Sequence, residues 1–152
     1  MKINLNPLAL VLYVNSLPAP KAGEAMGPVV RIVKDYVGDE GLLAHELEHV
    51  RQFWTLFFFF GVLPFAANWI AGSPLGNLGT LLLALGVSAH AALYLLVPRY
   101  RLWAELRAYS VQLKHMEPRE HYAAKYGTYI AEHYRLNISA NEATSRLLSM
   151  NT

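Results

Sequence analysis

The chain has 152 residues and no cysteine, so it can form one domain with a real core but has neither disulfides nor thiolate metal ligands. Its net charge of +2 gives no general attraction to nucleic acid or to acidic partners. Charged residues make up only 16% of the chain, against about 25% in soluble domains. The shortage is local, because residues 53–98 contain no Asp, Glu, Lys or Arg.

The N-terminal region alternates short apolar segments with loops. The apolar run at residues 7–14 is short for a signal peptide and lacks a clean cleavage site, so we predict a buried strand or a short helix there. Residues 18–27 are rich in Pro, Gly and Ala and are predicted to be a loop. Residues 29–37 are rich in β-branched side chains and are predicted to be a strand. That strand either offers an edge to an extended substrate or only covers the next helix.

The next segment contains the sequence His-Glu-x-x-His on a predicted helix with Asp39 as its N-cap. His45 and His49 are four positions apart, so they share one helix face and can hold one metal ion between them. Glu46 directly follows the first histidine, where a carboxylate can take a proton from the attacking water. The pattern favours a zinc peptidase site over a chance match on an ordinary helix.

The motif helix is predicted to continue into a long apolar hairpin. Residues 53–70 and 75–97 form two charge-free runs, each long enough to cross a bilayer, with a loop at residues 72–74 between them. Pro64 is predicted to kink the first run. Neither run has a polar face, which favours membrane spans over core helices of a soluble protein or a homo-oligomer interface.

Basic residues flank only the base of this hairpin. Arg51 precedes it and three arginines follow it, whereas the connecting turn carries no charge. By the positive-inside bias, the predicted site and both termini face the cytoplasm, and the protein is integral to the cytoplasmic membrane. A component of a phage virion is the alternative location.

Three helices are predicted after the hairpin. The first covers residues 99–116 and ends before Pro118, and the second covers residues 121–136. Ser139 and Glu142 form a capping box for the last helix. Four residues of the first of these helices share one face by their spacing: Glu105, Ala108, Tyr109 and Gln112.

The predicted fold class is mainly α. A short N-terminal strand region, the motif helix, the apolar hairpin and the C-terminal helices follow one another along the chain. We predict a single domain over residues 1–152, with residues 53–98 as an inserted hairpin.

A catalytic zinc usually has three protein ligands, so two histidines leave one ligand to be found. The candidates are Glu105, His90, His115, His121 and His133. His45-Glu46-x-x-His49 followed by Glu105-x-x-Ala108 resembles the gluzincin metallopeptidases, and the resemblance implies that Glu105 is the third ligand. Topology supports the same residue, since a hairpin that leaves the membrane where it entered brings Glu105 back beside His49.

The resemblance covers residues 29–52 and 99–112 and is to minimal gluzincins, to small phage and prophage proteins of peptidase type, and to membrane-bound gluzincins. It implies Zn²⁺ as the cofactor and a protein or peptide as the substrate. Glu46 is then the general base. The oxyanion also needs a donor, for which the candidates are Tyr109, Tyr126 and His133.

Two other functions stay open from the sequence. The first is a structural or membrane-inserting protein, such as a phage component, with a zinc site that is not catalytic. The second is a soluble peptidase or toxin-like enzyme whose apolar runs form the core of an oligomer. Glu48 and Arg51 are predicted to be solvated or to form a surface pair.

Overall fold

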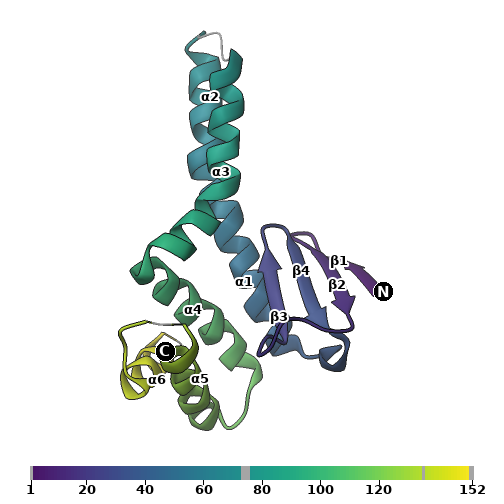
Figure 1. Cartoon of the computed structure of the whole chain (residues 1–152), viewed down its shortest axis with the longest axis vertical. Helices are drawn as coiled ribbons and strands as arrows, with labels where there is room; N and C mark the ends of the chain where they lie inside the picture. The colour runs from purple at the N-terminus through teal and green to yellow at the C-terminus, as the bar shows by residue number, and fades with distance from the viewer. Residues whose placement is uncertain (1, 73–75, 135, 151–152) are drawn as a thin grey trace.

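The structure, a computed structural model, describes residues 2–72, 76–134 and 136–150, and most of them are helical. A small sheet at the N-terminus is followed by a helix that extends into a long hairpin, and then by the C-terminal helices (Figure 1). The predicted fold class is therefore confirmed, with the strand region, the motif helix, the apolar hairpin and the later helices in the expected order.

The sheet has four strands in the order β1-β2-β4-β3: β1 (Lys2–Leu5), β2 (Leu10–Val14), β3 (Gly23–Met26) and β4 (Val29–Val33). β2 pairs with β1 in antiparallel and with β4 in parallel orientation, and β3 pairs antiparallel with β4. The apolar run at residues 7–14 thus forms a strand, whose Val11 and Tyr13 are buried.

Two predictions for this region are wrong, and one of two alternatives is excluded. The predicted loop at residues 18–27 contains β3, because pairing with β4 overrides the weak β propensity of Gly, Glu and Ala. β4 ends at Val33 instead of residue 37, since Lys34–Tyr36 form a 3-10 turn. β4 also lies between β2 and β3, which excludes the alternative of an exposed edge for this strand, and the edge strands of the sheet are β1 and β3.

One continuous helical rod carries the motif and the first arm of the hairpin, in three segments: α1 (Glu40–Phe57), a π-helical segment (Phe58–Val62) and α2 (Leu63–Ile70). Asp39 caps the rod as predicted, with its Oδ1 accepting a hydrogen bond from the Leu42 amide at 2.8 Å. Pro64 has no amide hydrogen to donate, and the π-helical segment lies directly before it, where the missing bond would fall.

The second arm is α3 (Gly76–Leu96), and the two arms project together from the rest of the molecule (Figure 1). Most of the predicted loop at residues 72–74 lies outside the described residues. The arms meet at two glycines, because a Cβ on Gly86 would lie 2.6 Å from the Cα of Gly61. Small residues of this kind allow two helices to approach closely.

Most side chains of the hairpin are exposed. Only 11% of the most apolar window in each arm is buried, and Ile70 near the tip is 83% exposed. The 21 residues of α3 give a length of about 31 Å, which matches the hydrocarbon thickness of a bilayer, about 30 Å. Both arms are thus long and apolar enough to cross a membrane, and neither lies in the core of this chain.

The remaining helices are α4 (Pro98–Gln112), which a 3-10 turn extends to His115, α5 (Arg119–His133) and α6 (Ala140–Ser149). They begin and end within a few residues of the predicted limits. Ser139 caps α6 as expected, since its hydroxyl accepts from the Glu142 amide at 3.2 Å. The Glu142 carboxylate pairs with Arg146.

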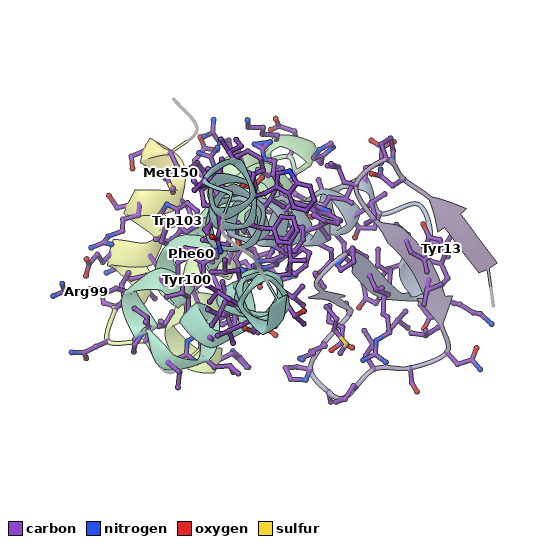
Figure 2. The ribbon with its side chains drawn as sticks, turned by 90° about the horizontal axis from the view of Figure 1, so that it is seen from above. Tyr13, Phe60, Arg99, Tyr100, Trp103 and Met150 are labelled. Atoms are coloured by element: carbon purple, nitrogen blue, oxygen red, sulfur yellow. The ribbon has the colours of Figure 1, made fainter. Side chains whose placement is uncertain are left out.

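Two cores lie on either side of the α1–α4 pair. One lies between the sheet and α1 and includes Val11, Ile32 and Val50, whereas the other joins α4, α5 and α6 around Ile130 and Leu147. Seen from above, the hairpin appears end-on between the sheet on one side and α6 on the other (Figure 2). The contact between α1 and α4 therefore lies between two packed bodies, at the base of the hairpin.

Candidate metal centre

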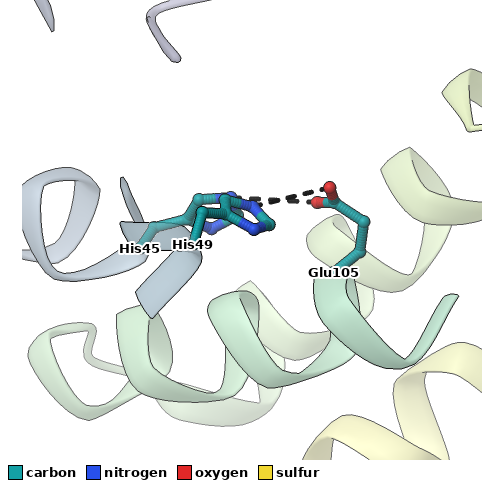
Figure 3. A group of neighbouring side chains, drawn as sticks. All are labelled: His45, His49 and Glu105. Carbon is teal, nitrogen blue, oxygen red and sulfur yellow. Dashed lines mark ion pairs between the residues drawn. The ribbon is translucent and has the colours of Figure 1, made fainter. Parts of the chain in front are cut away.

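Three of the predicted ligands come together where α1 packs on α4. His45 and His49 project from α1 toward Glu105 on α4 (Figure 3). The Nε2 atom of His45 is 3.8 Å from Oε2 of Glu105, and Nε2 of His49 is 3.5 Å from Oε1. The 56 positions between His49 and Glu105 are bridged by the hairpin, as the topology predicts.

The other four histidines considered as ligands have different neighbours. His90 is hydrogen-bonded to the Tyr100 hydroxyl at 2.8 Å, and its ring centroid is 6.4 Å from that of His49. The other three contact residues away from the cluster: His115 pairs with Glu40, His121 lies against Tyr122, and His133 stacks on Tyr129. Glu105 is the candidate that joins the two motif histidines.

The cluster fits a metal ion by distance and by donor type. Zinc bonds of about 2.0–2.2 Å in a tetrahedron separate the ligand atoms by about 3.3 Å, close to the distances of 3.5 and 3.8 Å found here. Glu105 is only 2% exposed, and its buried Oε2 has no hydrogen-bond partner among the described residues. Two imidazoles and one carboxylate are common donors to divalent metal ions, so this group could hold a metal ion.

Gln52 orients His49 from the far side of its ring. The Nδ1 of His49 is 3.1 Å from Oε1 of Gln52, whose Nε2 donates to the carbonyl of Ala104 at 3.2 Å. With the Nδ1 hydrogen donated to Gln52, the lone pair of Nε2 faces Glu105. Sequence reasoning gave Gln52 no role, although its position three residues after His49 on the same helix was a usable signal.

Tyr94 joins the hairpin to the candidate metal centre. Its hydroxyl, carried by α3, donates a hydrogen bond to Oε1 of Glu105, and its ring lies edge-on to that of His49 with centroids 6.2 Å apart. Sequence reasoning missed this residue because it treated α3 only as an apolar span. A tyrosine two residues before the end of that span, eleven positions before Glu105, was the available signal.

Tyr109 lies beside the cluster, but its hydroxyl has another partner. Its ring meets that of His45 edge-on at a centroid distance of 4.4 Å, whereas its hydroxyl is 3.3 Å from that of Tyr134. Burial, followed by the charge of Glu105, raises the pKa of Tyr109, so its hydroxyl stays protonated. Tyr126 packs on the ring of Tyr109 at 4.8 Å.

Glu46 lies between the metal-ligand cluster and the edge of the sheet. It is 4% exposed, and a Cβ on Gly23 of β3 would come within 2.7 Å of its Oε1. Burial, followed by the negative charges of Glu105 and Glu24, raises the pKa of Glu46 to about 8. Burial and the neighbouring His49 lower the pKa of His45, which keeps its ring neutral.

Glu48 is not the surface residue that the sequence predicted. It does pair with Arg51 at 3.5 Å, as predicted. However, Glu48 is only 7% exposed, and it also pairs with Arg107 of α4 at 3.3 Å. Glu48 therefore joins α1 to α4 on the side of the helix away from the sheet.

The geometry defines a class of site: two histidines one helical turn apart, a carboxylate from a second helix, and a buried glutamate after the first histidine. No protein-family profile, no curated protein and no solved structure matches the chain. The function therefore has to be inferred from the site and its surroundings.

Proposed function

We propose that this protein is a zinc-dependent endopeptidase of the gluzincin type, anchored in a membrane by its apolar hairpin. The observation that carries the proposal is the buried, unpartnered Oε2 of Glu105 beside the Nε2 of His45. Zinc bound by His45, His49 and Glu105 would polarise the scissile carbonyl and lower the pKa of a water molecule, which would attack as hydroxide after it loses a proton.

The chain itself supplies the proton transfers. Glu46 takes the proton of the attacking water and delivers it to the leaving amine. Its position between the cluster and Gly23 suits both steps, because water and substrate would meet there. Tyr109 is the proposed donor to the tetrahedral oxyanion, since its ring lies against His45, and its hydroxyl would exchange Tyr134 for the substrate oxygen.

The substrate would bind as an extended strand on the free edge of β3. The carbonyl of Ala22 accepts a hydrogen bond from the Val33 amide, so this pair faces inward toward β4. Because inward and outward groups alternate along a strand, the amides and carbonyls of Gly23 and Ala25 point to the free edge. Strand addition of this kind uses backbone hydrogen bonds and tolerates many side chains.

The hairpin provides the proposed membrane anchor. Its two arms are uncharged, and the flanking arginines all lie at its base. The positive-inside bias then places the metal centre and both termini on the cytoplasmic side of the membrane.

The test compares the wild-type protein with Glu46→Gln and with Glu48→Gln as a matched control. Wild type should contain one zinc per chain and cleave an unstructured protein. Glu46→Gln should keep its zinc and lose cleavage by about 10²–10⁴-fold, the usual contribution of a general base. Glu48→Gln, which alters a second buried glutamate of α1, should retain activity.

Three results would contradict the proposal. Wild-type protein without stoichiometric zinc contradicts the metal centre. Zinc-loaded wild type that cleaves nothing, together with unfolding of His45→Ala, indicates a structural or membrane-inserting protein. Recovery as a dispersed species without detergent contradicts the membrane anchor and favours a soluble oligomer.

A further inference from the structure

The strand β3 runs beside α1 from the proposed general base to the start of the apolar hairpin. At one end, Gly23 packs against the carboxylate of Glu46. At the other end, Gly27 follows β3, and a Cβ there would lie 3.4 Å from the ring of Phe53. Phe53 is the first residue of the charge-free segment. The free edge of β3 therefore runs from the proposed general base, Glu46, to the start of the apolar hairpin at Phe53.

Two independent measures give the length of this connection. Glu46 and Phe53 are seven positions apart on α1, which corresponds to about 10 Å at 1.5 Å per residue. The four residues of β3 cover about 10–13 Å at 3.3 Å per residue. A peptide paired with β3 would therefore have about three residues between the bond beside Glu46 and the level of Phe53.

Exposed apolar side chains lie on both sides of the molecule near Phe53, at the base of the hairpin. On the sheet side, Met26 at the end of β3 is 60% exposed, and Trp54 is held there by a hydrogen bond from its Nε1 to the Leu8 carbonyl at 2.9 Å. On the α4 side, Leu96 is 78% exposed and Trp103 is also exposed. A rim with two tryptophans at the base of an uncharged hairpin is typical of a membrane interface.

An aromatic face of α1 continues from the site toward the hairpin. Glu46, Phe53 and Phe57 are separated by seven and four positions, so they lie on one side of the helix. The rings of Phe53 and Phe57 stack, with centroids 6.2 Å apart and planes 8° apart. Phe53 is buried at 7% exposure, so the apolar surface open to a substrate at this level is formed by Met26 and Trp54, which are exposed.

We propose, given the peptidase function above, that the substrate is a polypeptide that emerges from the bilayer beside the hairpin and is cut about three residues outside its apolar boundary. The bilayer fixes one end of the substrate, and β3 aligns the emerging segment with Glu46. Distance from the membrane, more than side-chain sequence, then selects the bond.

The test uses the full-length wild-type protein in vesicles of phosphatidylcholine and phosphatidylglycerol. The probe is a peptide with one apolar span of about 20 residues. A long unstructured tail of randomised sequence follows the span, on the face of the membrane that carries the metal centre. Mass spectrometry of the products should place the cuts about two to five residues from the span. The same tail without its span should be cut at least about 10-fold more slowly, because the shared bilayer raises the effective concentration.

A second readout does not depend on cleavage. In the Glu46→Gln protein, a photo-crosslinker on the third tail residue should label residues 23–26, and one placed far along the tail should not. Cuts spread along the tail, or equal cleavage of the tail alone, would overturn this inference and leave the peptidase function standing. If no tail is cut by the zinc-loaded wild type, the peptidase function fails as well.

Discussion

The two halves of the long helical rod show opposite patterns of burial. From Glu40 to Gln52, the rod buries polar and charged side chains, among them His45, Glu46, Glu48 and Gln52. From Phe58 to Ile70, it exposes phenylalanine, leucine and tryptophan, and Gly61 is the one buried residue. A single helical rod therefore departs from the usual pattern in both halves, with polar side chains buried in the lower half and apolar side chains exposed in the upper half.

The difference shows that the two halves are suited to different surroundings. Buried charges are tolerated only when they are paired or bind metals. Across the α1–α4 contact, His45 and His49 face Glu105, and Glu48 faces Arg107. Exposed apolar side chains over this length are favourable only in lipid or in a protein interface. The change occurs between Gln52 and Phe58, within about two and a half helical turns of His49, so the metal centre lies close to the boundary.

Removal of Glu105 should have the largest effect on the lower half. Glu105→Ala leaves two histidines without their third partner, so the zinc content should fall from one per chain to almost none after dialysis. Metal analysis gives the answer, with Glu48→Gln as a control that changes a buried glutamate outside the cluster. Full zinc occupancy in Glu105→Ala would show that another group completes the site.

A charge in the middle of the apolar hairpin should be the next most severe change. Leu85 lies near the centre of α3 and is 51% exposed. An arginine at the centre of a membrane span costs about 2.5–3.5 kcal/mol, so Leu85→Arg should leave the carbonate-resistant membrane fraction. Thr128→Arg, on an exposed position of α5, is the control and should stay in that fraction. Equal behaviour of the two variants would indicate that α3 does not contact lipid.

Loss of the Tyr94 hydroxyl should weaken the link between the hairpin and the metal centre. Tyr94→Phe removes the donor to Oε1 of Glu105 without changing the shape of the ring. Outer partners of this kind contribute about 10–100-fold to metal affinity or activity, and chelator competition should show a decrease of that size. Tyr100→Phe loses a hydroxyl bonded to His90 and should keep its affinity. Equal affinities would mean that Tyr94 only fills space beside the ligand.

The parts of the molecule that local patterns determine were predictable. Four-residue spacing placed His45 and His49 on one face, and the charge-free run fixed the length of the hairpin and with it the return of Glu105. The Asp39 cap and the buried face of α4 follow from the same short-range rules.

The parts that depend on distant contacts were not predictable. β3 exists because β4 pairs with it, and its own four residues give little sign of a strand. Glu48 is buried because Arg107, 59 positions later, lies next to it. Tyr94 reaches Glu105 because of the rotation of α3 about its own axis, and an apolar run without a polar face carries no information about that rotation.

The smallest predicted effect concerns Gly23, where the sheet meets the proposed general base. In Gly23→Ala, the new methyl group would lie 2.7 Å from Oε1 of Glu46, so the flexible carboxylate should move by some tenths of an ångström while β3 stays in place. A displacement of 1 Å can cost about 100-fold in rate, so a decrease in kcat of about 10-fold is expected here. Zinc content should not change, and the free energy of unfolding should change by less than about 1 kcal/mol.

Thr128→Ala, on an exposed position of α5 away from the sheet, is the control, since it changes no atom near Glu46 or β3. Its kcat should stay within about twofold of wild type, because the change is remote from the reacting atoms. If Gly23→Ala instead keeps full activity and loses stability, then Gly23 serves only the packing of the sheet on α1. The free edge of β3 would then lose its link to the proposed general base, and the substrate path along β3 would lose its starting point.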